Sequence, residues 1–140
     1  MKTVSTNLAV RWSAAAPTLL SFLRIVAAFA FILFGTMKLF AFPAGMHGGG
    51  AVKLASQAGV AGVLETFGGA LLLLGLFTRP VAFIVAGEMA FAYFMVHVPK
   101  GFWPTLNGGV NAMLFCFIWL FISAAGPGPF SLDAQRRRWR

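Results

Sequence analysis

Four long apolar runs constrain the fold more than any other feature of this sequence. They cover residues 18–40, 58–77, 80–98 and 109–125. A helix needs about 20 consecutive apolar residues to cross the hydrocarbon core of a bilayer, and these runs are of about that length. They are continuously apolar and rich in Ala and Leu, without the alternation of a membrane-spanning strand. We therefore predict an all-α integral membrane protein, a four-helix bundle with up-down topology.

The segments between the runs support one membrane domain. Phe77-Thr78-Arg79-Pro80 is so short a turn that the second and third runs must be antiparallel neighbours. The runs fill more than half of the chain, so we expect residues 1–140 to form a single domain without a soluble part. The first run is longer than the 7–15 apolar residues of a signal peptide, so we expect it to stay as a span.

Composition and charge exclude two other classes of protein. The chain is 59% hydrophobic and only 10% charged, which excludes a disordered protein and leaves too few polar residues to cover a soluble fold. A net charge of +8 would suit a nucleic-acid binder, but such a protein spreads its basic residues over a face. Here the basic residues flank the apolar runs. We expect the lipid bilayer, and no nucleic acid, as the partner.

The distribution of basic residues predicts the orientation in the membrane. One side of a four-span chain would carry Lys2, Arg11, Arg79 and the tail, while the other would carry Lys53 and Lys100. The positive-inside rule then places both termini in the cytoplasm, with His47 and Lys100 facing outward. The tail is expected to hold the C-terminus on anionic lipid or to act as a topology signal alone. Its residues are Arg136, Arg137, Arg138, Trp139 and Arg140.

Ionisable residues inside the runs are the candidate site, because a charge within a membrane is costly to bury. They are Arg24, Lys38, Glu65 and Glu88. Helical side chains lean toward the N-terminus of their own helix, so Lys38 should approach Glu65. By the same rule Arg24 should approach Glu88, although a pair between Arg24 and Glu65 is the alternative. Lys38 could instead reach the outer surface and leave Glu65 protonated.

Two hypotheses explain the function of these charges. The charges either hold the bundle together or line a polar cavity for a small ligand or a proton. Cys116 is the only cysteine, which excludes an intrachain dithiol relay. His47 and His97 are not placed to hold a haem, and no metal-ligand cluster or phosphate-binding loop occurs. The sequence thus predicts no catalytic residue, no metal site and no encoded cofactor.

Several short motifs resemble the DoxX family. They are Phe34-Gly35-Thr36-Met37-Lys38, Leu64-Glu65-Thr66-Phe67-Gly68-Gly69 with the following LLLLGLFTRP, Gly87-Glu88-Met89-Ala90 and PKGFWPTLNGG at residues 99–109. The resemblance extends from about residue 18 to residue 133. The family motif falls on seven positions of this sequence, namely Gly35, Lys38, Glu65, Gly68, Gly69, Thr78 and Arg79.

The resemblance implies a small four-helix protein of the prokaryotic inner membrane. The family takes its name from a membrane subunit of an archaeal thiosulfate:quinone oxidoreductase, and other members are linked to oxidative-stress complexes. We therefore expect an accessory, non-catalytic subunit of such a complex, with a quinone-like ligand near Lys38 and Glu65. The alternatives are an assembly or structural partner without a ligand, and a small proton-coupled transporter in which Glu65 or Glu88 titrates. Other membrane proteins, or further copies of this chain, are the expected protein partners.

Overall fold

A computed structural model describes residues 3–46 and 49–139 of the chain. Lys2, His47 and Arg140, which entered the topology prediction, lie outside the described residues. Every regular element within the described ranges is helical. In chain order these are α1 (Thr3–Ala14), α2 (Ala16–Phe40), α3 (Gln57–Val63), the π-helical η2 (Leu64–Gly68), α4 (Gly69–Leu74), α5 (Thr78–Ala92), the π-helical η3 (Tyr93–His97), the 3₁₀-helical η4 (Val98–Lys100), α6 (Pro104–Asn107), α7 (Val110–Ala125) and α8 (Leu132–Arg138).

Three continuous helical stretches are long and apolar enough to cross a membrane, which confirms the all-α membrane class. They are Ala16–Phe40, Gln57–Leu74 and Thr78–Lys100. The fourth predicted span corresponds to α7, an apolar helix of 16 residues. Such a helix rises only about 24 Å, against roughly 30 Å for the hydrocarbon core. A fourth crossing therefore remains a prediction.

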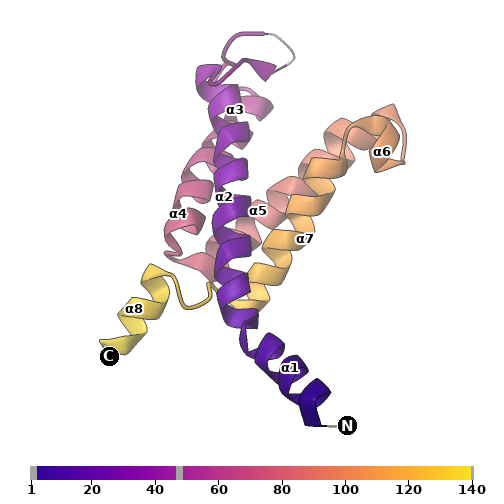
Figure 1. Ribbon diagram of the computed structural model, residues 1–140. Coiled ribbons are helices and arrows are strands. Elements are labelled where there is room, and N and C mark those ends of the chain that lie inside the picture. The colour runs from indigo at the N-terminus through magenta and orange to yellow at the C-terminus, as the bar shows by residue number, and fades with distance from the viewer. Residues whose placement is uncertain (1–2, 47–48, 140) are drawn as a thin grey trace.

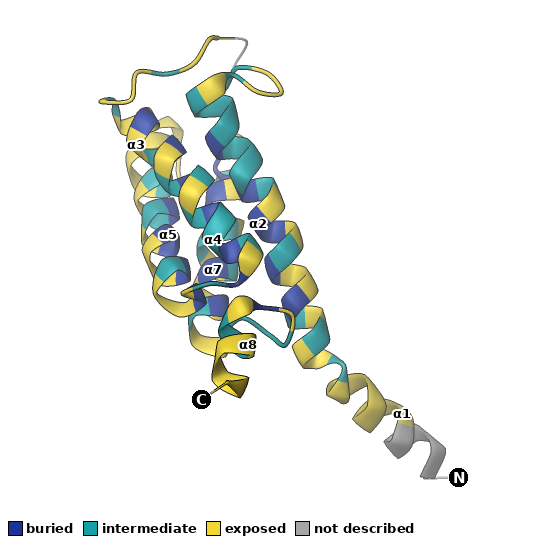
Figure 2. Cartoon of the chain, turned by 90° about the vertical axis from the view of Figure 1, so that its left-hand side faces the viewer, coloured by how far each residue is buried: buried dark blue, intermediate teal, exposed yellow. Residues whose placement is uncertain are grey.

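The helices form two closely packed pairs (Figure 1). α2 packs along α3, η2 and α4, while α5 packs along α7. The pairs lie close together at the end that carries α8 and diverge toward the end that carries α6. α1 and α8 lie at the same end of the molecule, so the two described chain ends are on one side. Buried residues line the faces that the helices turn toward one another (Figure 2).

An aromatic cluster joins the two pairs near the middle of the molecule. Phe31 of α2 is fully buried and packs against Phe115 and Trp119 of α7, with ring centroids 5.2 and 5.5 Å apart. Phe115 and Trp119 also stack on each other, at 6.2 Å. Such aromatic pairs are worth about 0.5–1.5 kcal/mol beyond the area that they bury. This cluster packs α2 directly against α7.

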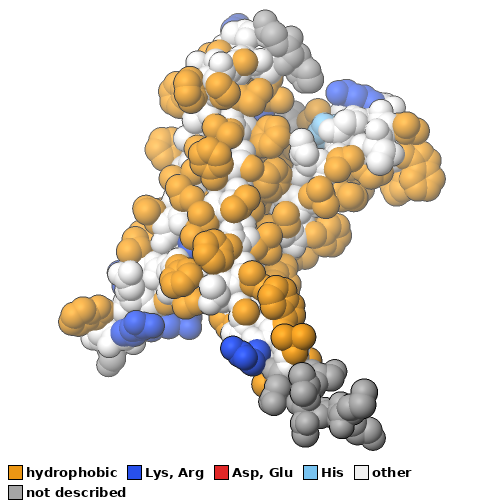
Figure 3. All heavy atoms as spheres, in the orientation of Figure 1, with side chains coloured by type: hydrophobic (Ala, Val, Ile, Leu, Met, Phe, Trp, Pro, Cys, Tyr) orange, Lys and Arg blue, Asp and Glu red, His pale blue; other side chains and the backbone are white. Residues whose placement is uncertain are grey.

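Large apolar side chains also cover the outer surface. Phe22, Phe29, Phe83 and Phe117 are each more than half exposed. Figure 3 shows hydrophobic side chains along the whole length of one face, with the main groups of Lys and Arg toward its two ends. A soluble monomer rarely exposes so continuous an apolar surface, whereas a bilayer requires one.

Glycines set the spacing between α2 and the α3–η2–α4 stretch. A Cβ atom on Gly35 would lie 2.3 Å from Thr66 Oγ1 and 2.8 Å from the carbonyl oxygen of Gly62. A Cβ atom on Gly69 would lie 2.7 Å from Ile32 Cγ1. Small residues of this kind let membrane helices approach closely, since dispersion contacts and not the hydrophobic effect hold such helices together in lipid.

The Gly35→Ala variant should unfold more readily than the wild type, because its new methyl group would force α2 away from η2. Overpacking of this kind costs about 1–3 kcal/mol. Thermal unfolding in mild detergent measures the effect. Gly87→Ala is the matched control, because a Cβ atom there meets nothing within 4 Å. Equal melting temperatures for the two variants would contradict the close contact at Gly35.

Candidate functional site

Lys38 and Glu65 form a buried ion pair between α2 and η2. Lys38 Nζ donates to Glu65 Oε1, and the two side chains are 14% and 3% exposed. The structure thus joins the two residues that were predicted to meet. Gly62 allows the approach, because a Cβ atom there would lie 3.0 Å from Lys38 Cβ. The second carboxylate oxygen, Glu65 Oε2, is buried without a hydrogen-bond partner among the described residues.

Glu65 lies in a short π-helical segment, Leu64–Gly68, between two α-helical stretches. A π-helical turn inserts into an α-helix and rotates the side chains that follow it. Such turns are frequent at functional sites. The apolar pattern of the sequence does not reveal this turn, because one inserted residue leaves the run equally apolar.

Glu88 lies beside this pair and has no partner of its own. Both of its carboxylate oxygens are buried, and neither has a hydrogen-bond partner within the described parts of the chain. It faces η2, since Val85, one turn earlier on α5, lies within 2.9 Å of a Cβ atom built on Gly68. Glu88 therefore lies on the face of α5 that packs against η2, the segment that carries Glu65. One lysine and two glutamates lie at this site.

Arg24 does not pair with Glu88, and this prediction was wrong. Its guanidinium is fully buried and donates instead to backbone carbonyls of two other segments. Nη1 bonds to Leu72 O at 2.6 Å and to Leu73 O at 3.1 Å, at the end of α4. Nε bonds to Pro127 O at 3.0 Å, and Nη2 bonds to Phe130 O. The alternative pair, Arg24 with Glu65, is also absent, since the Arg24 donors are used on these carbonyls and Glu65 pairs with Lys38.

The physical reason is that matching depth in the membrane does not make two helices neighbours. α2 packs mainly on the α3–η2–α4 stretch, whereas α5 packs mainly on α7. The last carbonyls of a helix have no partners within it, so the end of α4 offers acceptors to a nearby cation. Gly75 makes the approach to Arg24 possible, with a φ of +67° and a Cβ position only 2.4 Å from Arg24 Nη1.

Asp133, which the sequence analysis left out, fastens the C-terminal segment. Its Oδ1 accepts from the Phe77 amide at 3.0 Å, and its Oδ2 accepts from the Thr78 amide at 2.8 Å. Burial raises the pKa of Asp133, but these hydrogen bonds and the charge of Arg136 outweigh burial and hold the pKa below its usual range. The carboxylate therefore stabilises the fold at neutral pH, and this contribution is lost as the pH falls through the lowered pKa. The sequence signal that could have identified Asp133 is that it is a single acidic residue next to the basic C-terminal tail.

The remaining motif residues lie at helix contacts and helix ends. Gly35, Gly68 and Gly69 lie where helices approach closely. The Arg79 guanidinium donates to the carbonyls of Ser123, Ala124 and Ala125 and so caps the end of α7. The three glycines therefore set how closely the helices around Glu65 approach, whereas Arg79 stabilises the α8 end of the fold.

The other candidate groups do not join this site. Cys116 is a free, half-buried thiol on α7. His97 Nδ1 lies 3.1 Å from the carbonyl oxygen of Asn107, in a polar cluster at the α6 end. No group of three or more metal-ligating side chains occurs in residues 3–46 and 49–139.

A double-mutant cycle tests the energy of the buried pair. Glu65→Gln alone leaves the Lys38 ammonium without its counter-ion, and loss of one member of a buried pair costs about 3–5 kcal/mol. Lys38→Met combined with Glu65→Leu removes both charges and should recover much of that stability. Thermal unfolding in detergent of Lys38→Met, of Glu65→Leu and of the double variant gives the coupling energy.

Lys53→Met provides the control for this cycle, because Lys53 is exposed in the loop before α3. Its effect should add to that of Glu65→Leu without coupling. If Lys38→Met and Glu65→Leu were also additive, the ion pair would contribute nothing to stability.

Comparisons with known proteins identify the family of the chain. Residues 19–98 match the DoxX family, a stretch that runs from the first turn of α2 to the end of η3 and contains all seven motif positions. The segment at residues 99–109 that also carried the resemblance lies outside this match. A relative from Haemophilus influenzae, described as an uncharacterized protein, is 48% identical over 120 residues, which cover 84% of this chain and 90% of the relative. No solved structure matches the chain. On the family match, the chain belongs to the DoxX family of membrane proteins.

Proposed function

We propose that this protein is a non-catalytic accessory subunit of a redox or oxidative-stress membrane complex, and that it holds a quinone-like ligand beside Lys38, Glu65 and Glu88. The observation that carries the proposal is the Glu88 carboxylate, which is buried without a partner among the described residues. A buried polar group without a partner costs free energy, so its presence favours a role in binding.

The cluster supplies the groups that a quinone head needs. A quinone carbonyl accepts hydrogen bonds, and the Lys38 ammonium has three donors, of which Glu65 Oε1 accepts one. A quinol hydroxyl donates, and Glu65 Oε2 and the two Glu88 oxygens are available acceptors. The same three side chains could therefore hold the oxidised or the reduced form. Family membership supports the redox context, because the family takes its name from a subunit of a quinone-reducing enzyme.

A proton-coupled transporter is the second candidate, and the charge balance of the cluster favours it. With Lys38 and Glu65 paired, the net charge of the cluster is −1 when Glu88 is ionised and zero when Glu88 holds a proton. In a low-dielectric environment, the binding or release of this proton would change the net charge of the cluster, so proton movement would be coupled to the charge of the site. This reading needs no quinone and predicts proton release or uptake that depends on Glu88.

The Glu88→Gln variant tests whether Glu88 binds the ligand, because the change should affect ligand binding without lowering the stability of the fold. Since Glu88 has no partner in the described chain, this isosteric change should leave the melting temperature unchanged or raise it. The content of quinone that co-purifies in mild detergent, measured by solvent extraction and chromatography, should fall. Lys53→Met is the control and should retain the wild-type quinone content.

The other outcomes of this experiment discriminate the alternatives. Wild-type protein without quinone, but with proton uptake that Glu88→Gln abolishes, would support the transporter. Neither quinone nor proton uptake would leave an assembly or structural partner and would overturn the proposed ligand.

We further propose that the chain crosses the prokaryotic inner membrane four times, up and down, with both termini in the cytoplasm. The basic residues at the end of α1, at Arg79 and in α8 support this orientation. Single cysteines placed at Lys53 and Gln135, in a Cys116→Ala background, should react with an impermeant reagent from opposite sides of the membrane. Labelling of both from one side would contradict the four-span topology.

A further inference from the structure

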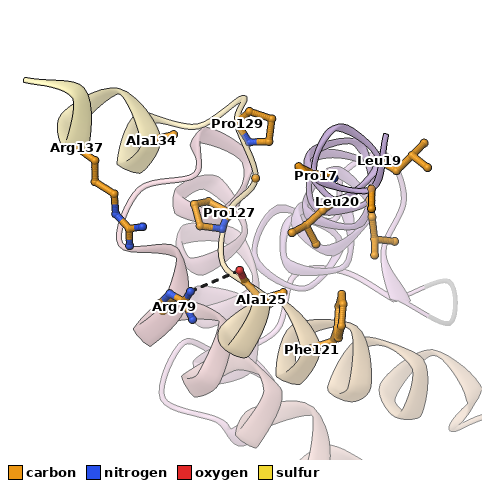
Figure 4. A pocket seen from close by; sticks show the side chains of 13 residues that line it. Pro17, Leu19, Leu20, Arg79, Phe121, Ala125, Pro127, Pro129, Ala134 and Arg137 are labelled. Carbon is orange, nitrogen blue, oxygen red and sulfur yellow. Dashed lines mark hydrogen bonds between the residues drawn. The ribbon is translucent and has the colours of Figure 1, made fainter. Parts of the chain in front are cut away.

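A cavity of about 820 Å³ lies at the end of the molecule that carries α1 and α8 (Figure 4). Its walls come from the start of α2, the end of α7, the connection 126–131 and α8. None of Arg24, Lys38, Glu65 and Glu88 lines it, so this cavity is separate from the site described above.

The walls of the cavity are fixed by polar contacts. Arg24 holds the connection through the carbonyls of Pro127 and Phe130, and Ser21 Oγ accepts from the Phe130 amide at 3.2 Å. Gly128 packs directly on α2, where a Cβ atom would lie 2.2 Å from Ser21 Oγ. Asp133 fastens α8 to the start of α5. The cavity is therefore preformed in the fold.

Two arginines give the cavity a positive rim. Figure 4 shows Arg137 extending from α8 in the direction of Arg79. Arg137 makes no hydrogen bond or ion pair with the described residues. Arg79 uses Nη1 and one hydrogen of Nη2 on the end of α7, which leaves its Nε–H and a second Nη2–H free within the same residues. Asp133, the acid nearest this rim, is already engaged by Phe77 and Thr78.

The opposite wall is apolar and faces outward. Leu19, Leu23 and Phe121 line it and are 47%, 42% and 58% exposed. They belong to the stretches of α2 and α7 that pass from the rim into the apolar body of the protein. A ligand that occupies the cavity thus meets guanidinium donors at one end and a hydrocarbon surface at the other.

We propose that this cavity binds an anionic phospholipid, with its phosphate at Arg79 and Arg137 and its acyl chains along Leu19, Leu23 and Phe121. Guanidinium groups bind phosphate oxygens through paired, charge-assisted hydrogen bonds. A lipid with no net charge would leave the rim uncompensated, and a water-soluble phosphate would leave the apolar wall uncovered. The inference stands apart from the proposed quinone site, because the two share no residue.

Native mass spectrometry of the intact protein in detergent tests the proposal. The protein is titrated with phosphatidylglycerol or with phosphatidylcholine that carries the same acyl chains. Phosphatidylglycerol should bind more tightly and be retained at collision energies that remove phosphatidylcholine. Arg137→Gln should weaken phosphatidylglycerol binding roughly fivefold, the factor expected for one basic residue near an anionic lipid.

Arg138→Gln is the matched control, because Arg138 lies on the same helix and does not line the cavity. It should leave the affinity for phosphatidylglycerol unchanged. An equal loss in both variants would show diffuse attraction to the basic helix and would overturn the cavity as a site. Equal binding of the two lipids would overturn the role of the arginines. Competition by glycerol 3-phosphate as strong as that by the lipid would show a site for a soluble anion and would also overturn the proposal.

Discussion

A charged side chain inside a membrane must find its partners within the protein, and the arrangement of these helices depends on that requirement. Arg24 meets it with four backbone carbonyls, which tie α2 to the end of α4 and to the C-terminal connection. Lys38 and Glu65 meet it with each other. Glu88 stays unpartnered in the described chain. The first two arrangements link helices of the fold to one another, and the third is the basis of the proposed ligand site.

The two ends of the molecule differ in how the segments are held together. Hydrogen bonds link distant segments at one end, and the helices are farther apart at the other. At the α8 end, Arg24, Arg79 and Asp133 each bond to the backbone of another segment. Toward the α6 end the two helix pairs diverge (Figure 1). Lys38 and Glu65 lie on α2 and η2, and Glu88 lies on α5, which packs against η2. A change in the spacing of the two helix pairs would therefore move Glu88 relative to Lys38 and Glu65.

The two proposed sites differ in the chemistry that they offer. The cluster of Lys38, Glu65 and Glu88 carries both signs of charge and suits a ligand or proton that changes state. The cavity beside Arg79 and Arg137 carries positive charge over an apolar wall and suits a lipid that stays in place. Lipid bound there would contact both α2 and α8, so it would reinforce the fastened end of the fold.

The sequence by itself determined the helical membrane class and identified the charged residues, since continuous apolar runs need lipid and rare charges within them stand out. The positions of the two residues along their helices were enough to predict the Lys38–Glu65 pair, because α2 and η2 pack against each other. The same reasoning failed for Arg24, whose partners are carbonyls of α4 and the C-terminal connection. Backbone carbonyls are the same at every residue, so only the tertiary structure decides which helix end reaches a buried cation. It also decided the π-helical turn at Glu65 and the place of Asp133, since both depend on local backbone geometry and on contacts between segments distant in sequence.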